Sequence, residues 1–261
     1  MESIHAPASP PPITGPHTPP PDTTVAPGNT VEAATGPDAL RPDFSDCYAG
    51  SRADRYHAHH RKSPLKRLAN GRELAAARRA LRMAGNPDSV LDLPCGTGRF
   101  WPVLCEREGR KLTAMDASSA MIETAFRRLP DAITERVDAS RGNAFDIRMP
   151  DGAVDTVFSM RFLHHLKERE DRLALLGEFR RVARSTVVIS VWVDGNFQAF
   201  SRRLRKKNSR GRYLIPREVL EREFIESGFA IEGHQDLLKF CSMWRVYVLR
   251  KLPESGNRLP A

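Results

Sequence analysis

The amino-acid sequence predicts an α/β fold with a mainly parallel β-sheet and helices on both of its faces. Between residues 70 and 250, short apolar runs alternate with longer stretches of helical periodicity, which is typical of strands joined by right-handed helical crossovers. The first apolar run breaks into a turn that contains two glycines. Ligands of such folds bind at the carboxyl ends of the strands. The loops expected to form the site follow Leu93, Met115, Gly142, Met160 and Val193.

The first half of the domain begins with a helix and then alternates strands with helices. Residues 73–83 are rich in strong helix formers, and residues 89–93 form an apolar run of strand length. The pattern becomes helical again over residues 99–108, behind the glycine turn. A second strand is expected over residues 111–115 and a second crossover helix over residues 119–129.

The second half continues the alternation. Residues 153–160 form a continuous apolar run, as expected of a strand that is buried on both faces. A helix over residues 167–183 has apolar residues at helical spacing, and residues 186–193 are rich in β-branched residues that favour a strand. The remaining expected elements are a weaker strand at 136–143, a helix at 216–227 and a closing strand pair at 229–233 and 243–249.

The two ends of the chain differ from this domain in composition. Residues 1–42 hold 11 of the 20 prolines and few apolar residues, so burial cannot offset the entropy of ordering them. We therefore expect a disordered proline-rich tail over residues 1–42, a folded domain over 43–252 and a flexible end over 253–261. The proline runs could bind a partner that has an aromatic groove, although a plain disordered extension explains them as well.

Charge and cysteine content limit the class of protein. Residues 41–261 contain all 41 Lys and Arg but 28 of the 32 acids, which gives this part a formal net charge of +13, against +9 for the whole chain. Such a charge favours an anionic partner, and solubility is an equally sufficient explanation. The four cysteines are not spaced like a zinc site or a disulfide framework. Without a recognisable signal peptide or transmembrane stretch, a cytoplasmic protein is expected.

The turn after the first strand carries the strongest functional signal. Gly96 and Gly98 allow a tight turn and let the backbone approach a ligand closely. A dinucleotide-binding loop would place a third glycine where this chain has Trp101, so a nicotinamide-dependent oxidoreductase is disfavoured. A P-loop is excluded because no Gly-Lys-Ser or Gly-Lys-Thr follows the turn.

Acidic residues end the first two strands. The carboxylate of Asp92 would repel a phosphate group, but it suits a ligand with a positively charged amino group, such as S-adenosylmethionine. Asp116 lies 18 residues beyond Gly98, where a carboxylate can accept hydrogen bonds from both hydroxyls of a ribose. The alternative role of Asp116 is an N-cap of the following helix.

The ordered succession of these motifs resembles the methyltransferase type 11 family of class I S-adenosylmethionine-dependent methyltransferases. The matching stretches are LDLPCGTGR, AMDAS with Met121 behind it, and GNAFDIRMPDGAVDTVFSMRFLHHL, and the likeness spans roughly residues 70–250. The resemblance implies a Rossmann-like, mainly parallel seven-stranded sheet with an antiparallel last strand. It also implies S-adenosylmethionine as the cofactor and methyl transfer as the reaction.

The same resemblance implies roles for individual residues. Asp92, Gly96 and Gly98 fall where the family contacts the amino-acid end and backbone of the cofactor, and Asp116 falls where it holds the ribose. The full expected cofactor-binding set is Asp92, Pro94, Gly96, Gly98, Asp116, Ala117, Met121, Asn143, Ala144 and Met160.

Two stretches depart from the family pattern. Asn143 and Ala144 occupy the adenine-binding loop, where the family usually has an aspartate at the position of Asn143. A carboxamide oxygen can still accept a hydrogen bond, so weaker adenine binding is expected. The turn glycines that usually precede the fifth strand are missing from residues 181–186, on the side of the sheet away from the cofactor.

Methyl transfer asks little of the protein beyond aligning the acceptor with the methyl group, because the sulfonium is already activated. His164 and His165 follow the fourth strand, and one of them could deprotonate a hydroxyl acceptor. The alternative is that both histidines only end the strand and pack. Arg161, at the same strand end, could bind an anionic acceptor or form a surface salt bridge.

Two basic segments could complete the site. Residues 43–70 correspond to the N-terminal lid helices of the family, in which Arg52 could pair with the cofactor carboxylate; a solvated helix is the alternative. The expected lid residues are Tyr48, Arg52, Tyr56 and His60. Arg202 to Arg212 contains seven basic residues and no acid, and it could contact an anionic membrane surface, a phosphorylated glycan or a nucleic acid, or remain solvated.

The sequence therefore predicts methyl transfer to a small-molecule or lipid-linked acceptor, which is expected to be anionic. Base methylation of nucleic acids is disfavoured, because the Asn-Pro-Pro-Tyr type of signature is missing. RNA stays an alternative acceptor, since contacts with its backbone need only positive charge. The alternative from another class is a non-catalytic module that binds S-adenosylmethionine or a partner.

Overall fold

The computed structural model describes residues 64–204, 211–238 and 241–253, and all structural statements below concern these residues. The proline-rich tail over residues 1–42, residues 43–63 of the expected lid and the last residues of the chain lie outside them. The same holds for residues 205–210 in the middle of the basic segment.

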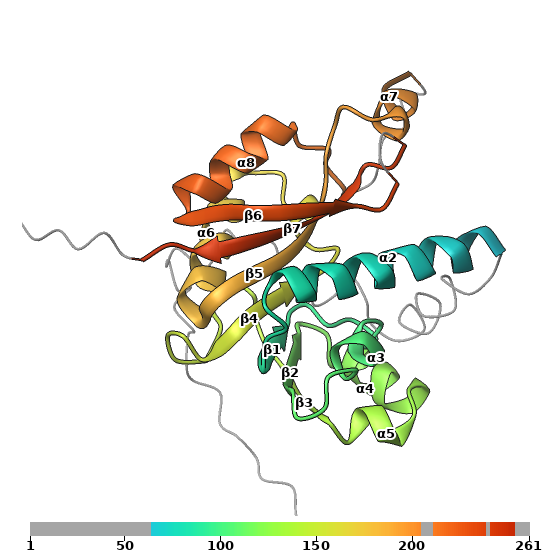
Figure 1. The fold of residues 1–261 in the computed structure, drawn as a ribbon, viewed down its shortest axis with the longest axis vertical. Helices are drawn as coiled ribbons and strands as arrows, with labels where there is room; N and C mark the ends of the chain where they lie inside the picture. Colours follow the sequence, from blue (N-terminus) through green and yellow to red (C-terminus); the bar gives the residue numbers. More distant parts are fainter. Residues whose placement is uncertain (1–63, 205–210, 239–240, 254–261) are drawn as a thin grey trace, which may run out of the picture. The chain divides into compact units, whose positions relative to one another are not determined.

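A seven-stranded sheet forms the centre of the domain (Figure 1), in the order β3-β2-β1-β4-β5-β7-β6. The strands are β1 Ser89–Asp92, β2 Lys111–Asp116, β3 Val137–Arg141, β4 Val154–Ser159, β5 Ala183–Trp192, β6 Phe229–Asp236 and β7 Trp244–Lys251. Neighbours from β3 to β5 pair in parallel, whereas β7 pairs antiparallel with both β5 and β6. The predicted mainly parallel sheet with an antiparallel last strand is confirmed.

Helices cover both faces of the sheet. The helices are α2 Pro64–Met83, α3 Trp101–Leu104, α4 Ser119–Arg128, α5 Asp131–Thr134, the 3-10 helix η3 Leu163–His165, α6 Arg169–Val182, α7 Phe197–Leu204 and α8 Arg217–Glu226. The hydrophobic core on one face includes residues of α6 and α8, and the core on the other face includes residues of α2, α3 and α4. None of the helices described is long and apolar enough to cross a membrane.

The central strand β5 explains why the sequence shows continuous apolar runs. Val187 and Ile189 belong to the core under α6 and α8, whereas Val188 between them belongs to the core under α2. Successive side chains of a strand point to opposite faces, so a strand covered on both sides needs apolar residues at every position. The helix α6 ends at Val182 and β5 begins at Ala183, which accounts for the missing turn glycines.

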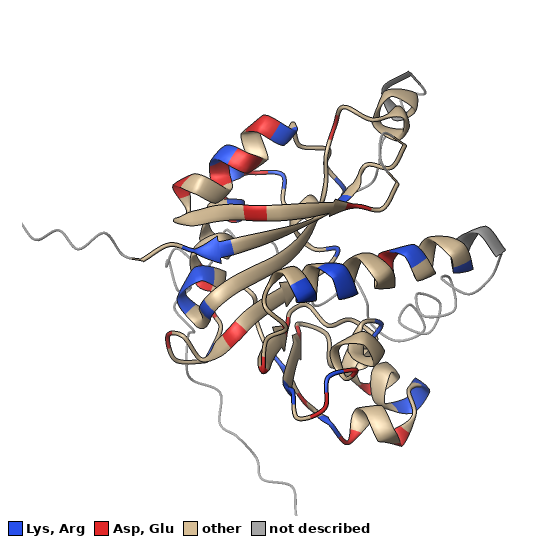
Figure 2. Cartoon of the chain, viewed as in Figure 1, with Lys and Arg blue, Asp and Glu red and all other residues tan. Residues whose placement is uncertain are grey.

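Two helices differ from the expected ranges by more than two residues at an end. The helix expected over residues 99–108 ends at Leu104, because guanidinium groups bind the carbonyls that a longer helix would use: Arg110 donates to Leu104 O at 2.9 Å and Arg136 to Cys105 O at 2.6 Å. The helix α2 begins at Pro64 rather than at Glu73 and therefore includes the end of the expected lid segment. Basic residues recur along α2 (Figure 2).

Candidate functional site

The glycine turn lies at the carboxyl end of β1 and follows a cis peptide bond between Leu93 and Pro94. Gly96 and Gly98 both have positive φ, at +56° and +66°, a conformation that side chains disfavour. A Cβ atom on Gly98 would lie 2.7 Å from Leu129 and 2.8 Å from the Trp101 ring, whereas one on Gly96 would meet no heavy atom within 4 Å. Trp101 thus fills the space beneath Gly98, and the outer side of Gly96 is open to a ligand.

Asp116 ties the ends of three strands together. The Gly96 N–H donates to Asp116 Oδ2 at 2.8 Å, and the Ser118 N–H donates to Oδ1 at 2.9 Å. The Gly142 N–H, behind β3, donates to the Asp116 carbonyl at 3.0 Å. Burial raises the pKa of Asp116, and the two hydrogen bonds partly offset this rise. The N-cap of α4 is Ser118, so Asp116 binds the glycine turn instead of serving as that cap.

Asp92, the last residue of β1, is buried without a partner. Its side chain is 1% exposed, and neither carboxyl oxygen has a hydrogen-bond partner among the described residues. Burial raises the pKa of Asp92 well above its ordinary value, and repulsion from Asp116 adds to the rise. The nearby indole N–H of Trp101 lowers the pKa of Asp92, although the two groups do not reach hydrogen-bond geometry. A buried carboxyl group without a partner is costly unless a ligand compensates it.

The remaining members of the expected cofactor set line the same strand ends. Asn143, behind β3, is exposed, and its Oδ1 accepts the Phe145 N–H at 3.0 Å, so this oxygen is already engaged within the loop. Ala144, Met121 and Met160 are buried. Pro94 and Ala117 are half-buried beside the glycine turn and behind β2.

His164 lies in an aromatic cluster behind β4. Its ring stacks on Trp192 with a centroid distance of 4.7 Å and meets the edge of Trp244 at 5.0 Å. The side chain is 2% exposed, and burial, with the positive charges of His165, Arg212 and Arg161, lowers the pKa of His164 to about 2. A neutral imidazole with such a pKa is a weak proton acceptor, so the geometry favours the packing role of His164.

His165 has a different environment. It is half-buried, and its Nδ1 lies 2.6 Å from the carbonyl oxygen of Gly211. A carbonyl oxygen only accepts, so Nδ1 carries the hydrogen and the neutral ring has its lone pair on Nε2. Burial lowers the pKa of His165, the contact with Gly211 opposes this shift, and Arg212 adds to it.

Arg161 follows β4 and has a positive φ of +65°, which is unfavourable for a residue with a side chain. Its N–H donates to Ser190 Oγ at 2.7 Å, and its guanidinium binds both oxygens of Glu73, at 2.7 and 2.8 Å. The same guanidinium lies over the Trp244 ring, 4.8 Å from its centroid. The surface salt bridge considered for Arg161 is therefore an ion pair with a buried carboxylate.

Glu73 is a site residue that sequence reasoning missed. It is 1% exposed and also binds Arg99, directly behind the glycine turn, at 2.5 Å. Burial by itself would raise the pKa of Glu73, but Arg161 and Arg99 outweigh burial and lower it. One sequence signal could have found it: Glu73 is the single acid of α2 and shares a helix face with the buried Ala76 and Ala77.

Comparison with known proteins agrees with this geometry. Residues 90–186, from β1 into β5, match a family model described as "Methyltransferase domain". This range includes the glycine turn, Asp116, the loop of Asn143 and both histidines of η3. The finer assignment to type 11 stays a prediction.

Solved structures share the fold at low sequence identity. The magnesium protoporphyrin IX methyltransferase of Synechocystis, with bound SAH, is 14% identical, with a TM-score of 0.64 over 79% of this chain and 97% of that chain. A possible histamine N-methyltransferase of Thermotoga maritima is 17% identical, with a TM-score of 0.57 over 76% and 97%. The [4+2]-cyclase SpnF is 16% identical, with a TM-score of 0.52 over 68% and 82%.

The family match, the strand order and the glycine turn with its two carboxyl groups lead to one assignment. Residues 90–186 match the methyltransferase domain family, and the fold is that of S-adenosylmethionine-dependent methyltransferases.

Proposed function

We propose that the protein binds S-adenosylmethionine and transfers its methyl group to a small-molecule acceptor. The observation that carries this proposal is the pair of buried carboxyl groups, Asp92 and Asp116, beside the open turn at Gly96. An ammonium group near Asp92 would supply the missing hydrogen bonds and favour the charged carboxylate. Asp116 already accepts two N–H groups, and a carboxylate has lone pairs for a ribose hydroxyl as well.

The residues of the chain position the reactants. S-adenosylmethionine, when bound, supplies a methyl group that is already activated for in-line transfer. Asp92 and Gly96 would hold the amino-acid end, and Asp116 would orient the ribose, so that the acceptor meets the methyl group in line. The adenine and the rest of the ligand would contact Pro94, Gly98, Ala117, Met121, Asn143, Ala144 and Met160.

A proton acceptor is needed only where the acceptor is a hydroxyl or another protonated group. His165 is the better candidate of the two histidines, because its contact with Gly211 places the lone pair on Nε2 and burial keeps the ring neutral. His164, with a pKa of about 2, would shape the site through its contacts with Trp192 and Trp244.

A second candidate function is a non-catalytic module of the same fold. Asn143 favours it, because the oxygen proposed to face adenine already accepts the Phe145 N–H. The cyclase among the solved structures carries the same fold under a description other than methyltransferase, and fold alone does not fix function. Lipid-linked acceptors and RNA are the alternative substrates within the enzymatic proposal.

Calorimetry with S-adenosylmethionine tests the cofactor site. We expect micromolar binding by the wild type, and binding weakened about 50-fold by Asp116→Ala, which removes charge-assisted hydrogen bonds to the ligand. Asp138→Ala is the matched control, because Asp138 has an exposed side chain on the neighbouring strand β3. Circular dichroism would show that both variants keep the fold.

A label-transfer experiment then separates the two candidate functions. The protein is incubated with methyl-labelled S-adenosylmethionine and a small-molecule extract of cells. Label transfer by the wild type and Asp138→Ala, but not by Asp116→Ala, supports the enzyme. Binding without transfer to any compound would favour the non-catalytic module. Absence of binding at millimolar ligand would contradict the enzyme and leave a module that binds a partner.

A further inference from the structure

A pocket outside the cofactor residues lies at the same end of the sheet. Its volume is about 590 Å³, within the range of small-molecule sites, roughly 300–1,000 Å³. Side chains of α2, α7 and the hairpin between β6 and β7 form its walls, and Arg161 and Glu73 lie at its inner side. Glu73 also binds Arg99 behind the glycine turn, so one buried carboxylate joins this pocket to the expected cofactor site.

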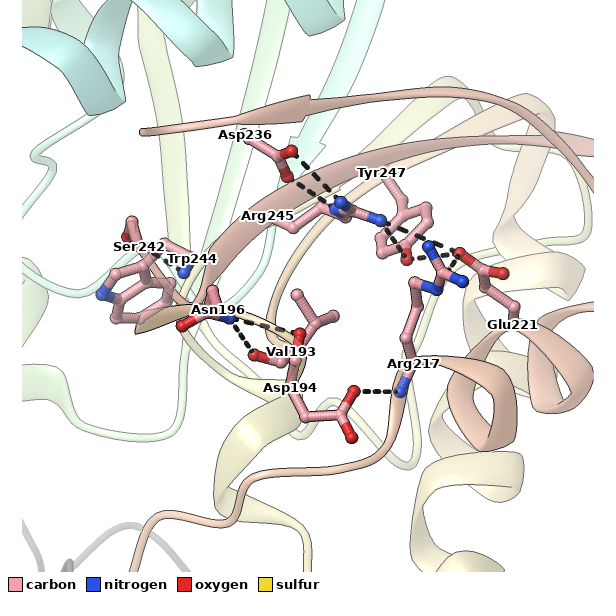
Figure 3. A network of polar contacts seen from close by, with 10 residues as sticks. All are labelled: Val193, Asp194, Asn196, Arg217, Glu221, Asp236, Ser242, Trp244, Arg245 and Tyr247. Carbon is pink, nitrogen blue, oxygen red and sulfur yellow. Dashed lines mark hydrogen bonds and ion pairs between the residues drawn. The ribbon is translucent and has the colours of Figure 1, made fainter. Parts of the chain in front are cut away.

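Hydrogen bonds hold the two outer walls of the pocket against each other. The Gln198 N–H of α7 donates to the Cys241 carbonyl at 3.1 Å, and Gln198 Oε1 accepts the Met243 N–H at 3.1 Å. Figure 3 shows that Arg245 of β7 and Asp236 of β6 join the two strands of the hairpin: Arg245 donates to both oxygens of Asp236, at 2.6 and 3.1 Å. These bonds join α7 to the hairpin without a ligand, and a lining that is already in place lowers the entropic cost of binding.

The polar side of the pocket carries a positive charge. Glu73 is paired with two guanidinium groups, those of Arg161 and Arg99, so the three side chains together carry one net positive charge. Arg72, one position before Glu73, also lines the pocket; it is exposed and has no ion-pair partner among the described residues. An anionic group is the complementary ligand for this side.

Apolar side chains form another part of the pocket lining. Phe197 of α7 is 71% exposed and Leu238 of the hairpin is 45% exposed, and both line the pocket with Leu237 and Trp244. Large apolar side chains that remain exposed around a pocket mark a binding site, because a ligand can remove them from water. Burying such a side chain against a ligand removes apolar surface from water and so favours binding.

We propose that this pocket binds the methyl acceptor, and that the acceptor is an amphipathic small molecule with a bulky apolar body and a carboxylate or phosphate group. The apolar body would lie between Phe197 and Leu238, and the anionic group would face Arg72 and Arg161. The identification of this ligand as the methyl acceptor rests on the proposed function. Binding of the ligand to the pocket can be measured without S-adenosylmethionine.

Cys241 provides a local readout, because it lines the pocket and is exposed, whereas Cys95 and Cys105 are buried. The full chain is alkylated with iodoacetamide in the presence of 1-naphthoate, 1-naphthyl phosphate or neutral 1-naphthamide. Peptide mass spectrometry measures the rate at Cys241 alone and so separates it from Cys47. We expect one or both anionic probes to protect Cys241 at a concentration about 10-fold lower than the amide.

Two pairs of variants test the two sides of the pocket. Arg72→Gln should reduce the preference for the anion to about 2-fold, whereas Arg82→Gln makes the same charge change on α2 outside the pocket lining and should keep the preference. Phe197→Ser should weaken protection by all three probes. Phe200→Ser is its control, because Phe200 is 59% exposed on the same helix but does not line the pocket.

The proposal is overturned if the amide protects Cys241 as well as the anions do, or if no probe protects it at millimolar concentration. It is also overturned if Arg82→Gln reduces the preference for the anion as much as Arg72→Gln does, or if Phe200→Ser weakens protection as much as Phe197→Ser does. S-adenosylmethionine binding without pocket binding would remove this inference and leave the proposed function intact. Pocket binding without S-adenosylmethionine binding would support the anionic amphipathic site and contradict the proposed function. A stronger effect of naphthoate or of naphthyl phosphate identifies the anionic group.

Discussion

Individual buried groups in this domain have protonation states that depend on their surroundings. Asp92 has two unpartnered oxygens, and His164 has an unpartnered Nδ1 among the described residues. Burial disfavours the charged form of both, so the pKa of the acid is raised and that of the histidine is lowered. These two residues have different expected roles. A cationic ligand would compensate Asp92, whereas burial and the nearby positive charges keep His164 neutral.

The histidine makes stability depend on pH. In the folded protein the pKa of His164 is about 2, against 6.5 for an ordinary histidine. The unfolded chain therefore takes up a proton below pH 6.5 that the folded protein does not, so this stability is complete above pH 6.5 and decreases as the pH falls. Between pH 6.5 and 5.0 the loss amounts to about 1.5 kcal/mol.

We expect His164→Phe, which keeps an aromatic ring, to remove this part of the pH dependence. Urea unfolding at pH 6.5 and 5.0 would measure it as a smaller loss of unfolding free energy than in the wild type. The control is His234→Phe, because His234 is exposed and should contribute less. An unchanged loss in His164→Phe would show that this imidazole is protonated in the folded protein.

At the scale of elements, α2 joins the functional end of the domain through a single acid. Glu73 binds Arg161 behind β4 and Arg99 behind the glycine turn, so it connects a helix with the ends of two neighbouring strands. Both guanidinium groups would lose their ion pair with Glu73 if Glu73 were neutral, and breaking a buried ion pair is costly. A positive φ at Arg161 is retained because these contacts fix the loop.

Glu73→Gln should lower the free energy of unfolding by about 3 kcal/mol, the usual cost of breaking a buried ion pair. Glu106→Gln is the matched control: it breaks the ion pair with Arg78, whose side chains are 41% and 46% exposed, and should cost at most about 1 kcal/mol. Denaturant unfolding measures both values. Equal losses would mean that the buried pair contributes no more than a surface pair.

At the scale of the whole molecule, the chain carries a formal net charge of +9. Several of its arginines are balanced within the domain, as in the buried pair of Arg172 in α6 with Glu223 in α8. The stretch from Arg202 to Arg212 contains no acid to balance its seven basic residues. The long-range attraction of a polyanion to such a charge is screened by salt, and it does not depend on the nucleotide sequence of the polyanion.

We therefore expect RNA binding that is weak, independent of sequence and lost as the salt concentration rises. Filter binding at several NaCl concentrations would measure the slope of log affinity against log salt. Replacing Arg205, Lys206 and Lys207 by Gln should reduce that slope by up to about 0.7 for each lost phosphate contact. The control replaces Arg127, Arg128 and Arg148, which lie outside this stretch. In 0.5 M NaCl the Debye length is about 4 Å, so binding of one RNA structure that persists there would instead favour an RNA acceptor.

The strand and helix succession was predictable because it depends on local patterns. Continuous apolar runs identified β4 and β5, and the expected ranges for β1 and β2 differ from the observed ones by a single residue at the carboxyl end. The helix predicted over residues 99–108 is shorter than expected, Trp101–Leu104, and the guanidinium groups of Arg110 and Arg136 bind the carbonyls of Leu104 and Cys105 at its end. The helix α7 was not predicted, because its eight residues are too few to show a clear helical periodicity of apolar side chains.

The sequence by itself determined the order of the elements, the glycine turn and the acids at the strand ends, because periodicity, turn residues and strand polarity are properties of neighbouring residues. It also indicated the family, since these motifs keep a fixed order along the chain. Only the tertiary structure decided the partners of Glu73, the burial of His164 and the pocket beside α7. Those features join residues far apart in sequence, such as Glu73 with Arg161 and His164 with Trp244, and no local pattern specifies which distant side chains will meet.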